Sequence, residues 1–241
     1  MLCLHFDQVT ILEVNKSGHP VNELSTVPAA ATVGDLLEIC RLLGDVAPSR
    51  VLIHPDPTTA TENDVRATEA TGKLVELVDG TLVEKPMSWE ESILAMKLGT
   101  FLNIWLSTNN LGIVSGADGG YKLFPKLIRL PDVAFVSWER IRTKAIDRKA
   151  YPELAPDLAV EIVSESNSPG EMLRKVREYF SAGVRAVWIA YPSARTVRVY
   201  SDTDNFRDLT INDTLEGGQV LPGFSLAVVD WFRCLDQLPD Q

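Results

Sequence analysis

The stretch that decides the fold is PDLAVEIVSESNSPGEMLRKVREYF, residues 156–180. Residues 158–163 are apolar and rich in β-branched side chains, which predicts a buried strand, yet Glu161 stands in the middle of that run. A helix is expected next, with Lys175 beside its apolar stripe and its end at Gly183. Because an isolated carboxylate is costly to bury without a cation or strong donors, Glu161 needs a partner.

Alternation along the strands places a second carboxylate near Glu161. Side chains of a strand alternate between its two faces, so Glu161 shares a face with Asp157 and Ala159. In the run PDVAFV, Asp132 likewise shares a face with Ala134, and the two alanines leave room for something larger than a side chain. Asp157 and Glu161 are roughly 13 Å apart at about 3.3 Å per residue, so they cannot both bind one ion. Asp132 and Glu161 can do so if their strands pair.

Lys175 supplies the third element of this site. It lies three residues after Met172 and four before Tyr179, at the border of the apolar stripe, and can lean over the sheet toward Glu161. Two carboxylates and an ammonium form a site for a divalent cation, a water and a phosphate. Carboxylate oxygens suit Mg²⁺ or Mn²⁺, which would activate water while the lysine positions the nucleophile or the phosphate.

Other common chemistries lack their residues in this sequence. The histidines, at positions 5, 19 and 54, all precede the region that carries these motifs, which excludes a Ser-His-Asp triad or a histidine zinc site there. The sequence has no C-x-x-C pair, no G-x-S-x-G elbow and no G-x-x-x-x-G-K-[ST] phosphate loop. Carboxylates and lysine therefore remain as the side chains that could carry out chemistry in this region.

Bulk composition sets wide limits. The chain has 241 residues, 45% of them hydrophobic, and a formal net charge of −10. That charge argues weakly against broad nucleic-acid binding, although a local basic patch or bound metal ions would offset it. No apolar run approaches the roughly 18–20 residues of a membrane span, and no secretion signal is evident. Three scattered cysteines favour a reducing compartment, so a cytoplasmic protein is expected.

The pattern along the chain predicts two parts. Residues 1–70 are interpreted as an N-terminal extension, partly irregular, with a short strand and capped helix starts at Thr32 and Thr61. Residues 71–241 are expected to form one α/β domain with a mixed central sheet flanked by helices. Its expected elements are a hairpin around Asp79-Gly80, a helix from Ser88, a second hairpin around 117–120, one strand over 127–138, the strand and helix of 156–183, and further strands to the end.

Taken together, Pro131-Asp132, Glu161-Ile162-Val163 and Lys175 resemble the PD-(D/E)XK nuclease superfamily, and most of all its Uma2 (DUF820) branch of restriction-type endonucleases. The similarity covers roughly residues 73–232 and includes ELVDGTLVE, IRLPDVAFVSW, RKVREYFSAGVRAVWI and LPGFSL. The superfamily motif has lysine two residues after the glutamate, where this chain has Val163. In the Uma2 branch the lysine has moved to the next helix, which Lys175 matches.

The resemblance implies a restriction-endonuclease-like core and a metal-dependent DNA endonuclease that often acts as a homodimer. Asp132 and Glu161 would bind Mg²⁺ or Mn²⁺, and Lys175 would assist the attacking water. The acidic residue of the superfamily's first helix falls at Glu91, where many Uma2 relatives carry histidine.

Each residue also has a structural interpretation. Asp132 would begin a strand, Glu161 and Lys175 would form an ion pair or Lys175 would extend into water, and Glu91 would favour a helix N-terminus. Glu76, Arg174 and Arg177 are expected to face solvent. Asp157 is expected at the entry to a strand. The core is expected to contain Trp138, Trp188 and Tyr179. The alternative functions are a catalytically silent module that binds nucleic acid or protein, and a carboxylate-pair glycosidase.

Overall fold

The computed structural model describes residues 32–86, 88–143 and 151–237. The first 31 residues of the expected N-terminal extension, including its short strand, lie outside the described residues.

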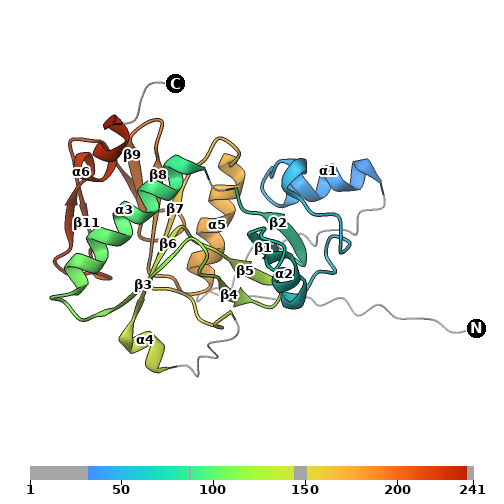
Figure 1. Cartoon of the computed structure of the whole chain (residues 1–241), viewed down its shortest axis with the longest axis horizontal. Helices are drawn as coiled ribbons and strands as arrows, with labels where there is room; N and C mark the ends of the chain where they lie inside the picture. Colours follow the sequence, from blue (N-terminus) through green and yellow to red (C-terminus); the bar gives the residue numbers. More distant parts are fainter. Residues whose placement is uncertain (1–31, 87, 144–150, 238–241) are drawn as a thin grey trace, which may run out of the picture.

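A six-stranded mixed sheet forms the centre of the molecule (Figure 1). Its strands run in the order β10 (Phe206–Leu209), β9 (Thr196–Tyr200), β8 (Ala186–Tyr191), β7 (Leu158–Ile162), β6 (Val133–Ser137) and β3 (Gly112–Gly116). β7 and β8 are parallel, and the other neighbours are antiparallel. This arrangement confirms the predicted α/β class with a mixed central sheet.

Helices cover both faces of this sheet. Leucines of α3 (Trp89–Leu106) pack with Val160 and Ile162 of β7, together with aromatic residues of α6 (Val228–Phe232). On the opposite face, Ala159 packs with residues of α5 (Pro169–Ser181). The predicted alternation along β7 is therefore confirmed, and Glu161 lies on the α5 face.

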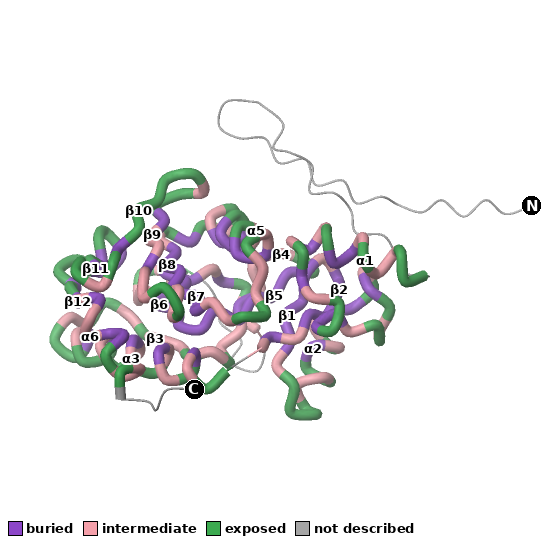
Figure 2. The backbone as a smooth tube through the Cα atoms, turned by 90° about the horizontal axis from the view of Figure 1, so that it is seen from above, coloured by how far each residue is buried: buried purple, intermediate pink, exposed green. Residues whose placement is uncertain are grey.

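A smaller four-stranded antiparallel sheet lies beyond α5, so that α5 stands between the two sheets (Figures 1 and 2). Its order is β2 (Thr81–Glu84), β1 (Val75–Val78), β5 (Leu127–Arg129) and β4 (Tyr121–Phe124). The remaining described elements are α1 (Val33–Leu42), η1 (Pro48–Arg50), α2 (Glu62–Glu69), α4 (Trp138–Arg142), η2 (Arg233–Gln237) and the strand pair β11 (Thr214–Glu216) and β12 (Ser225–Ala227).

Local sequence signals placed several of these elements correctly. Thr32, Thr61 and Ser88 each form a capping box at a helix start. Asp79 and Gly80 both have positive φ, 49° and 72°, as the two-residue turn between β1 and β2 requires.

Two predicted elements are wrong, and both errors concern how the chain passes between the sheets. The expected second hairpin does not form, because β3 pairs with β6 in the large sheet while β4 pairs with β5 in the small one. The expected strand 127–138 is two strands, β5 and β6, separated at Leu130-Pro131-Asp132. Proline has no N–H to continue a ladder, so Pro131 suits the place where the chain changes sheets.

The described residues before position 71 pack on the small sheet. Ile39, Leu43 and Val51 share a buried cluster with Val78 and Val83. Arg50 reaches further, and its two terminal nitrogens each lie 2.8 Å from an oxygen of Glu171 on α5. The segment that packs on the small sheet is therefore also bound to α5.

Candidate active site

Asp132 lies where the chain enters the large sheet. Its N–H donates to the Val160 carbonyl at 2.9 Å, and its Oδ2 accepts a hydrogen bond from the Ile162 N–H at 2.7 Å. The β6–β7 register pairs Val133 with Val160, which places Asp132 across from Glu161. The predicted pairing of the two carboxylate strands is confirmed.

Glu161 is 3% exposed and has a partner at each oxygen. Lys175 Nζ lies 2.9 Å from Oε2, and the Tyr179 hydroxyl donates to Oε1 at 2.5 Å. Burial raises the pKa of Glu161 and the charge of Lys175 opposes that rise, while Asp132 adds to it. Tyr179 is in the core as expected, and its hydroxyl also belongs to the site.

Lys175 is buried between the two sheets, so its expected alternative position in water is wrong. Its ammonium contacts Glu161 of β7 and, at 3.2 Å, Oε1 of Glu76 in β1. Burial alone would lower the pKa of Lys175, but the two carboxylates outweigh it and the pKa is raised. One ammonium thus joins the large sheet to the small one.

Glu76 was expected in solvent and is instead 1% exposed. It accepts hydrogen bonds from Arg129 at 2.7 Å and from the Leu130 N–H at 3.0 Å, in addition to its contact with Lys175. Burial favours the protonated form, but Lys175 and Arg129 prevail and lower the pKa of Glu76. The signal available in the sequence was its position inside the apolar run LVELV.

Lys85 is the residue that the sequence analysis missed altogether. It follows β2, is 7% exposed, and its Nζ lies 2.8 Å from Asp132 Oδ1. The same ammonium donates to the carbonyls of Leu130 and Ala117. Its burial implies a partner, because lysine is rarely buried without one, but the sequence around it carries no sign of that burial.

Glu91 lies at the edge of this cluster. It is 6% exposed, and its Oε2 accepts the Ser88 N–H at 3.0 Å as part of the capping box. Burial is the main cause that raises the pKa of Glu91, and the charge of Asp132 contributes. The helix-cap interpretation of Glu91 is confirmed. The charges of Asp132 and Lys85 also act on the pKa of the Glu91 carboxyl, in opposite directions.

Arginines extend the network along α5. Arg129 is bound to Glu178 at 2.7 Å, and Arg174 contacts Glu178 at 2.6 Å and Asp79 at 2.7 Å. The expected solvated position of Arg174 is therefore wrong, whereas that of Arg177 is confirmed. Trp188 is buried as expected. The core position expected for Trp138 is wrong, because this side chain is half-buried and its indole N–H donates to Asn110.

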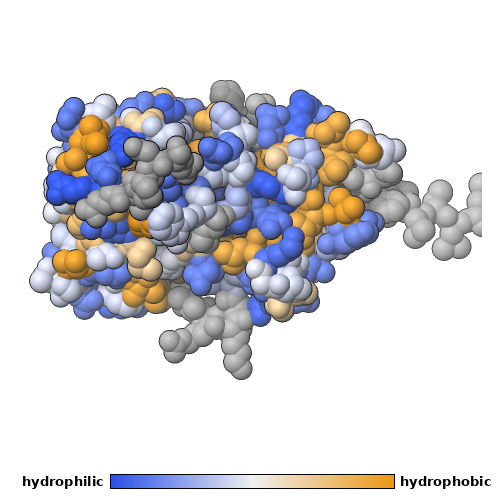
Figure 3. Space-filling model, turned by 45° about the horizontal axis from the view of Figure 1, so that its top comes forward, coloured by the Kyte–Doolittle hydropathy of each residue, from blue (hydrophilic) through white to orange (hydrophobic). Residues whose placement is uncertain are grey.

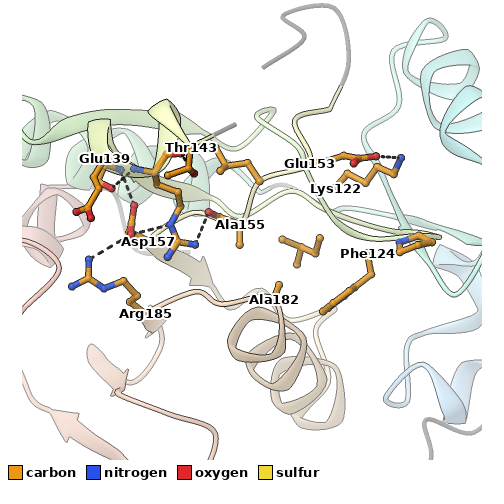
Figure 4. A pocket seen from close by; sticks show the side chains of 14 residues that line it. Lys122, Phe124, Glu139, Thr143, Glu153, Ala155, Asp157, Ala182 and Arg185 are labelled. Carbon is orange, nitrogen blue, oxygen red and sulfur yellow. Dashed lines mark hydrogen bonds and ion pairs between the residues drawn. The ribbon is translucent and has the colours of Figure 1, made fainter. Parts of the chain in front are cut away.

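Asp157, the other carboxylate of the β7 stretch, lies apart from this cluster. It directly precedes β7, as its strand-entry interpretation requires, and accepts the Ser137 N–H at 2.7 Å. Arg140 and Arg185 approach it at 3.1 and 3.5 Å. These side chains line an open cleft of about 790 Å³ between α4 and the end of α5 (Figure 4).

The cluster is compatible with a divalent cation. In the part of the chain that the structure describes, no three His, Cys, Asp or Glu side chains are grouped to hold a metal. Mg²⁺ is commonly bound through only one or two carboxylates, with waters and phosphate oxygens as its other ligands, and Asp132 and Glu161 can supply two. Among the described residues, the network joined through these contacts has more carboxylates than cations. Its members are Glu76, Asp79, Glu91, Asp132, Glu161 and Glu178 against Lys85, Arg129, Arg174 and Lys175.

Most side chains of the cluster are buried, and Arg174 is half-buried. Figure 3 shows hydrophobic and hydrophilic patches interspersed on the face of the molecule that it presents. Among the helices that the structure describes, none is long and apolar enough to cross a membrane.

Fold and site together define a mixed α/β protein with a buried acid–base cluster between its two sheets. The family model of Uma2, described as "Putative restriction endonuclease", matches residues 62–229, and the chain belongs to this family. Membership supports a nuclease role.

A solved structure shares the fold. It is the crystal structure of "a putative nuclease belonging to DUF820" from Anabaena variabilis, 18% identical, with a TM-score of 0.59 over 68% of this chain and 92% of that one. None of the curated proteins matches this chain.

Proposed function

We propose that this chain is a metal-dependent DNA endonuclease with its active site at Asp132, Glu161 and Lys175, assisted by Glu91. The observation that carries the proposal is the pairing of Asp132 with Glu161 across neighbouring strands, both buried and both in contact with a lysine ammonium. Mg²⁺ or Mn²⁺ is the proposed cofactor. The homodimer and the cytoplasmic location stay predictions.

The contacts of Asp132 and Glu161 indicate the role of each carboxylate. The Ile162 N–H fixes one oxygen of Asp132, and Tyr179 fixes one oxygen of Glu161, so both carboxylates are held in place before a ligand arrives. Preorganised charged groups in a water-poor site stabilise developing charge without reorganising during the reaction. A divalent cation held by Asp132 and Glu161 would supply Lewis-acid polarisation of the phosphate and activation of water.

Lys175 has donors for the phosphodiester. Its ammonium is held by Glu161 and Glu76, and a small movement away from either carboxylate would direct a proton toward a phosphate oxygen or the attacking water. Glu91, with its raised pKa, would hold or accept a proton at the outer edge of the cluster.

The test is nicking of supercoiled plasmid with Mg²⁺ or Mn²⁺. Wild type is compared with Glu161→Gln, Asp132→Asn and a chelated sample, and with Asp157→Asn as the matched control. Asp157 lies just before β7, which carries Glu161, and is equally buried, but it is outside the cluster. We expect both cluster variants to lose cleavage by on the order of 100-fold or more, as when one charge-stabilising group is removed. No cleavage by folded wild type, or equal cleavage by all variants, would contradict the proposal.

A second candidate is a catalytically silent binding module, and one observation favours it. Glu161 already has Lys175 and Tyr179 as partners, so its charge is compensated without a metal. In that case the ion pair is structural, and the folded protein binds DNA or a protein without cutting in any metal. A glycosidase would retain its activity in a chelator, which separates it from the nuclease.

A further inference from the structure

The ammonium of Lys85 sits in a cage of oxygens. Its three contacts are the Asp132 carboxylate at 2.8 Å, the Leu130 carbonyl, and the Ala117 carbonyl at 3.3 Å. A lysine ammonium has three donors, so these contacts use all of them. The side chain is 5% exposed.

Two separate segments supply the oxygens of this cage, and a third carries Lys85. Leu130 and Asp132 belong to the crossover between β5 and β6, and Ala117 belongs to the turn that follows β3. Lys85 follows β2 in the small sheet, and its N–H donates to the Leu74 carbonyl, which fixes its backbone. A carboxylate oxygen with main-chain carbonyls is also the ligand set that hard divalent cations take in proteins.

The charges around Lys85 are mostly negative. Its ammonium contacts Asp132 and influences the carboxyl groups of Glu76, Glu91 and Glu161. A positive charge at this point therefore holds together carboxylates that would repel one another. An ammonium and a divalent cation at the same oxygen would repel as well.

We infer that Lys85 occupies the cation position at Asp132 and that a divalent cation binds there by displacing its ammonium. This inference rests on the proposed metal-dependent function. Lys85 is then a positioning residue: it holds Asp132 in place when no metal is bound, and it sets the metal concentration at which the site fills.

The direction of the effect separates this role from a structural one. A side chain that only supports Asp132 would, on removal, weaken metal binding. A side chain that competes with the metal would, on removal, strengthen it. Lys85→Met removes the charge and keeps most of the length and apolar stem. Lys85→Gln also removes the charge and retains a donor for the Leu130 carbonyl, in case the first variant does not fold.

The measurement is Mn²⁺ binding, with free Mn²⁺ counted by electron paramagnetic resonance in the absence of DNA. We expect Lys85→Met and Lys85→Gln to bind Mn²⁺ roughly tenfold or more tightly than wild type, equivalent to about 1.4 kcal/mol. Lys73→Met is the charge-matched control, because Lys73 pairs with Glu84 at 3.1 Å on the surface of the same hairpin. Its affinity should equal that of wild type.

Equal or weaker Mn²⁺ binding by both folded Lys85 variants would overturn the inference and leave the proposed nuclease intact. No Mn²⁺ binding by wild type or by any variant would overturn the inference together with the proposed metal site.

A second test uses the wild-type protein in crystals. In crystals soaked with Mn²⁺, anomalous scattering should locate the ion against Asp132, with the Lys85 ammonium moved away from Oδ1. An ion bound to Asp132 while Lys85 keeps its 2.8 Å contact would overturn the inference.

Discussion

One buried carboxylate lies directly before β7 and another near the end of this strand, and different cations surround them. Asp157 is bound by a main-chain N–H and approached by the guanidinium groups of Arg140 and Arg185. Glu161 meets an ammonium and a phenol, those of Lys175 and Tyr179. Both carboxylates are almost fully buried. Burial alone therefore does not distinguish a structural carboxylate from a candidate catalytic one.

The identity of the cation is what distinguishes the two ends. Arg140 also donates to the carbonyls of Ala155 and Gly183, so its fixed set of donors joins the chain segments around the start of β7. A lysine ammonium is a compact point charge on a flexible stem, and it can exchange one oxygen partner for another more readily than a guanidinium can. Lys85 and Lys175 therefore suit a site that must accept a ligand.

Lys175→Met should have the largest effect on stability. It leaves Glu161 and Glu76 buried without their shared cation, and the expected loss in free energy of unfolding is about 3–5 kcal/mol. Urea unfolding followed by circular dichroism measures it. Arg177→Met, exposed on the same helix, should change stability by less than about 0.5 kcal/mol. A loss below about 1 kcal/mol for Lys175→Met would mean that the two carboxylates do not depend on it.

Glu171→Gln tests a fixed guanidinium pair next to the lysine cluster. Burial alone would raise the pKa of Glu171, but its hydrogen bonds from Arg50 and nearby charges lower it overall. A carboxylate with a lowered folded-state pKa contributes stability above its unfolded pKa of about 4.3, and that contribution is lost as pH falls through the folded value.

At pH 7 we therefore expect Glu171→Gln to be less stable than wild type by about 2–3 kcal/mol, as for a lost hydrogen bond to a charged group. The difference should narrow on acidification from pH 6 to below the unfolded pKa, measured by urea unfolding at each pH. A constant difference across this range would show that the pair contributes through shape and not through charge.

Asp157→Asn should cost less, about 1–2 kcal/mol, because asparagine retains an acceptor for the Ser137 N–H. The variant should still nick plasmid at the wild-type rate, provided that the assay is run below its melting temperature. Loss of cleavage in the folded variant would place Asp157 in the active site and remove the distinction between the two ends of β7.

Lys73→Met should have the smallest effect, under about 0.5 kcal/mol, since exposed ion pairs contribute little and are screened by salt. Its partner Glu84 is half-buried, with 38% of its side chain exposed, and the contact is 3.1 Å. Differential scanning calorimetry at two salt concentrations would check this, and a larger loss would point to a packing role for the lysine stem.

Local patterns in the sequence predicted much of the fold and half of the site. The apolar run around Glu161, the helix that carries Lys175 and the turn at Asp79-Gly80 depend on neighbours in the chain, and all three are confirmed. Strand alternation also identified the face of Glu161 that meets α5.

The other half depends on residues far apart in the sequence. Lys85 donates to the carbonyls of Ala117 and Leu130, which are 32 and 45 residues away in the sequence. Glu76 accepts from Arg129 at a sequence separation of 53 residues. Nothing in the local pattern of these residues shows that two sheets meet there. The change of sheet at Pro131 was hidden because the residues on both sides of it favour strands.

The bond between Arg50 and Glu171 has a practical consequence for how short the chain can be made. The family match begins at residue 62 and ends at 229, yet Arg50 lies before it and the fully buried Trp231, whose indole N–H donates to the Leu94 carbonyl, lies after it. A chain trimmed to the matched residues would leave Glu171 buried without its guanidinium and α3 without its aromatic partner. A piece that keeps both contacts must begin before η1 and end beyond Trp231 in α6, and one that also keeps the buried cluster of Ile39 and Leu43 must begin before α1.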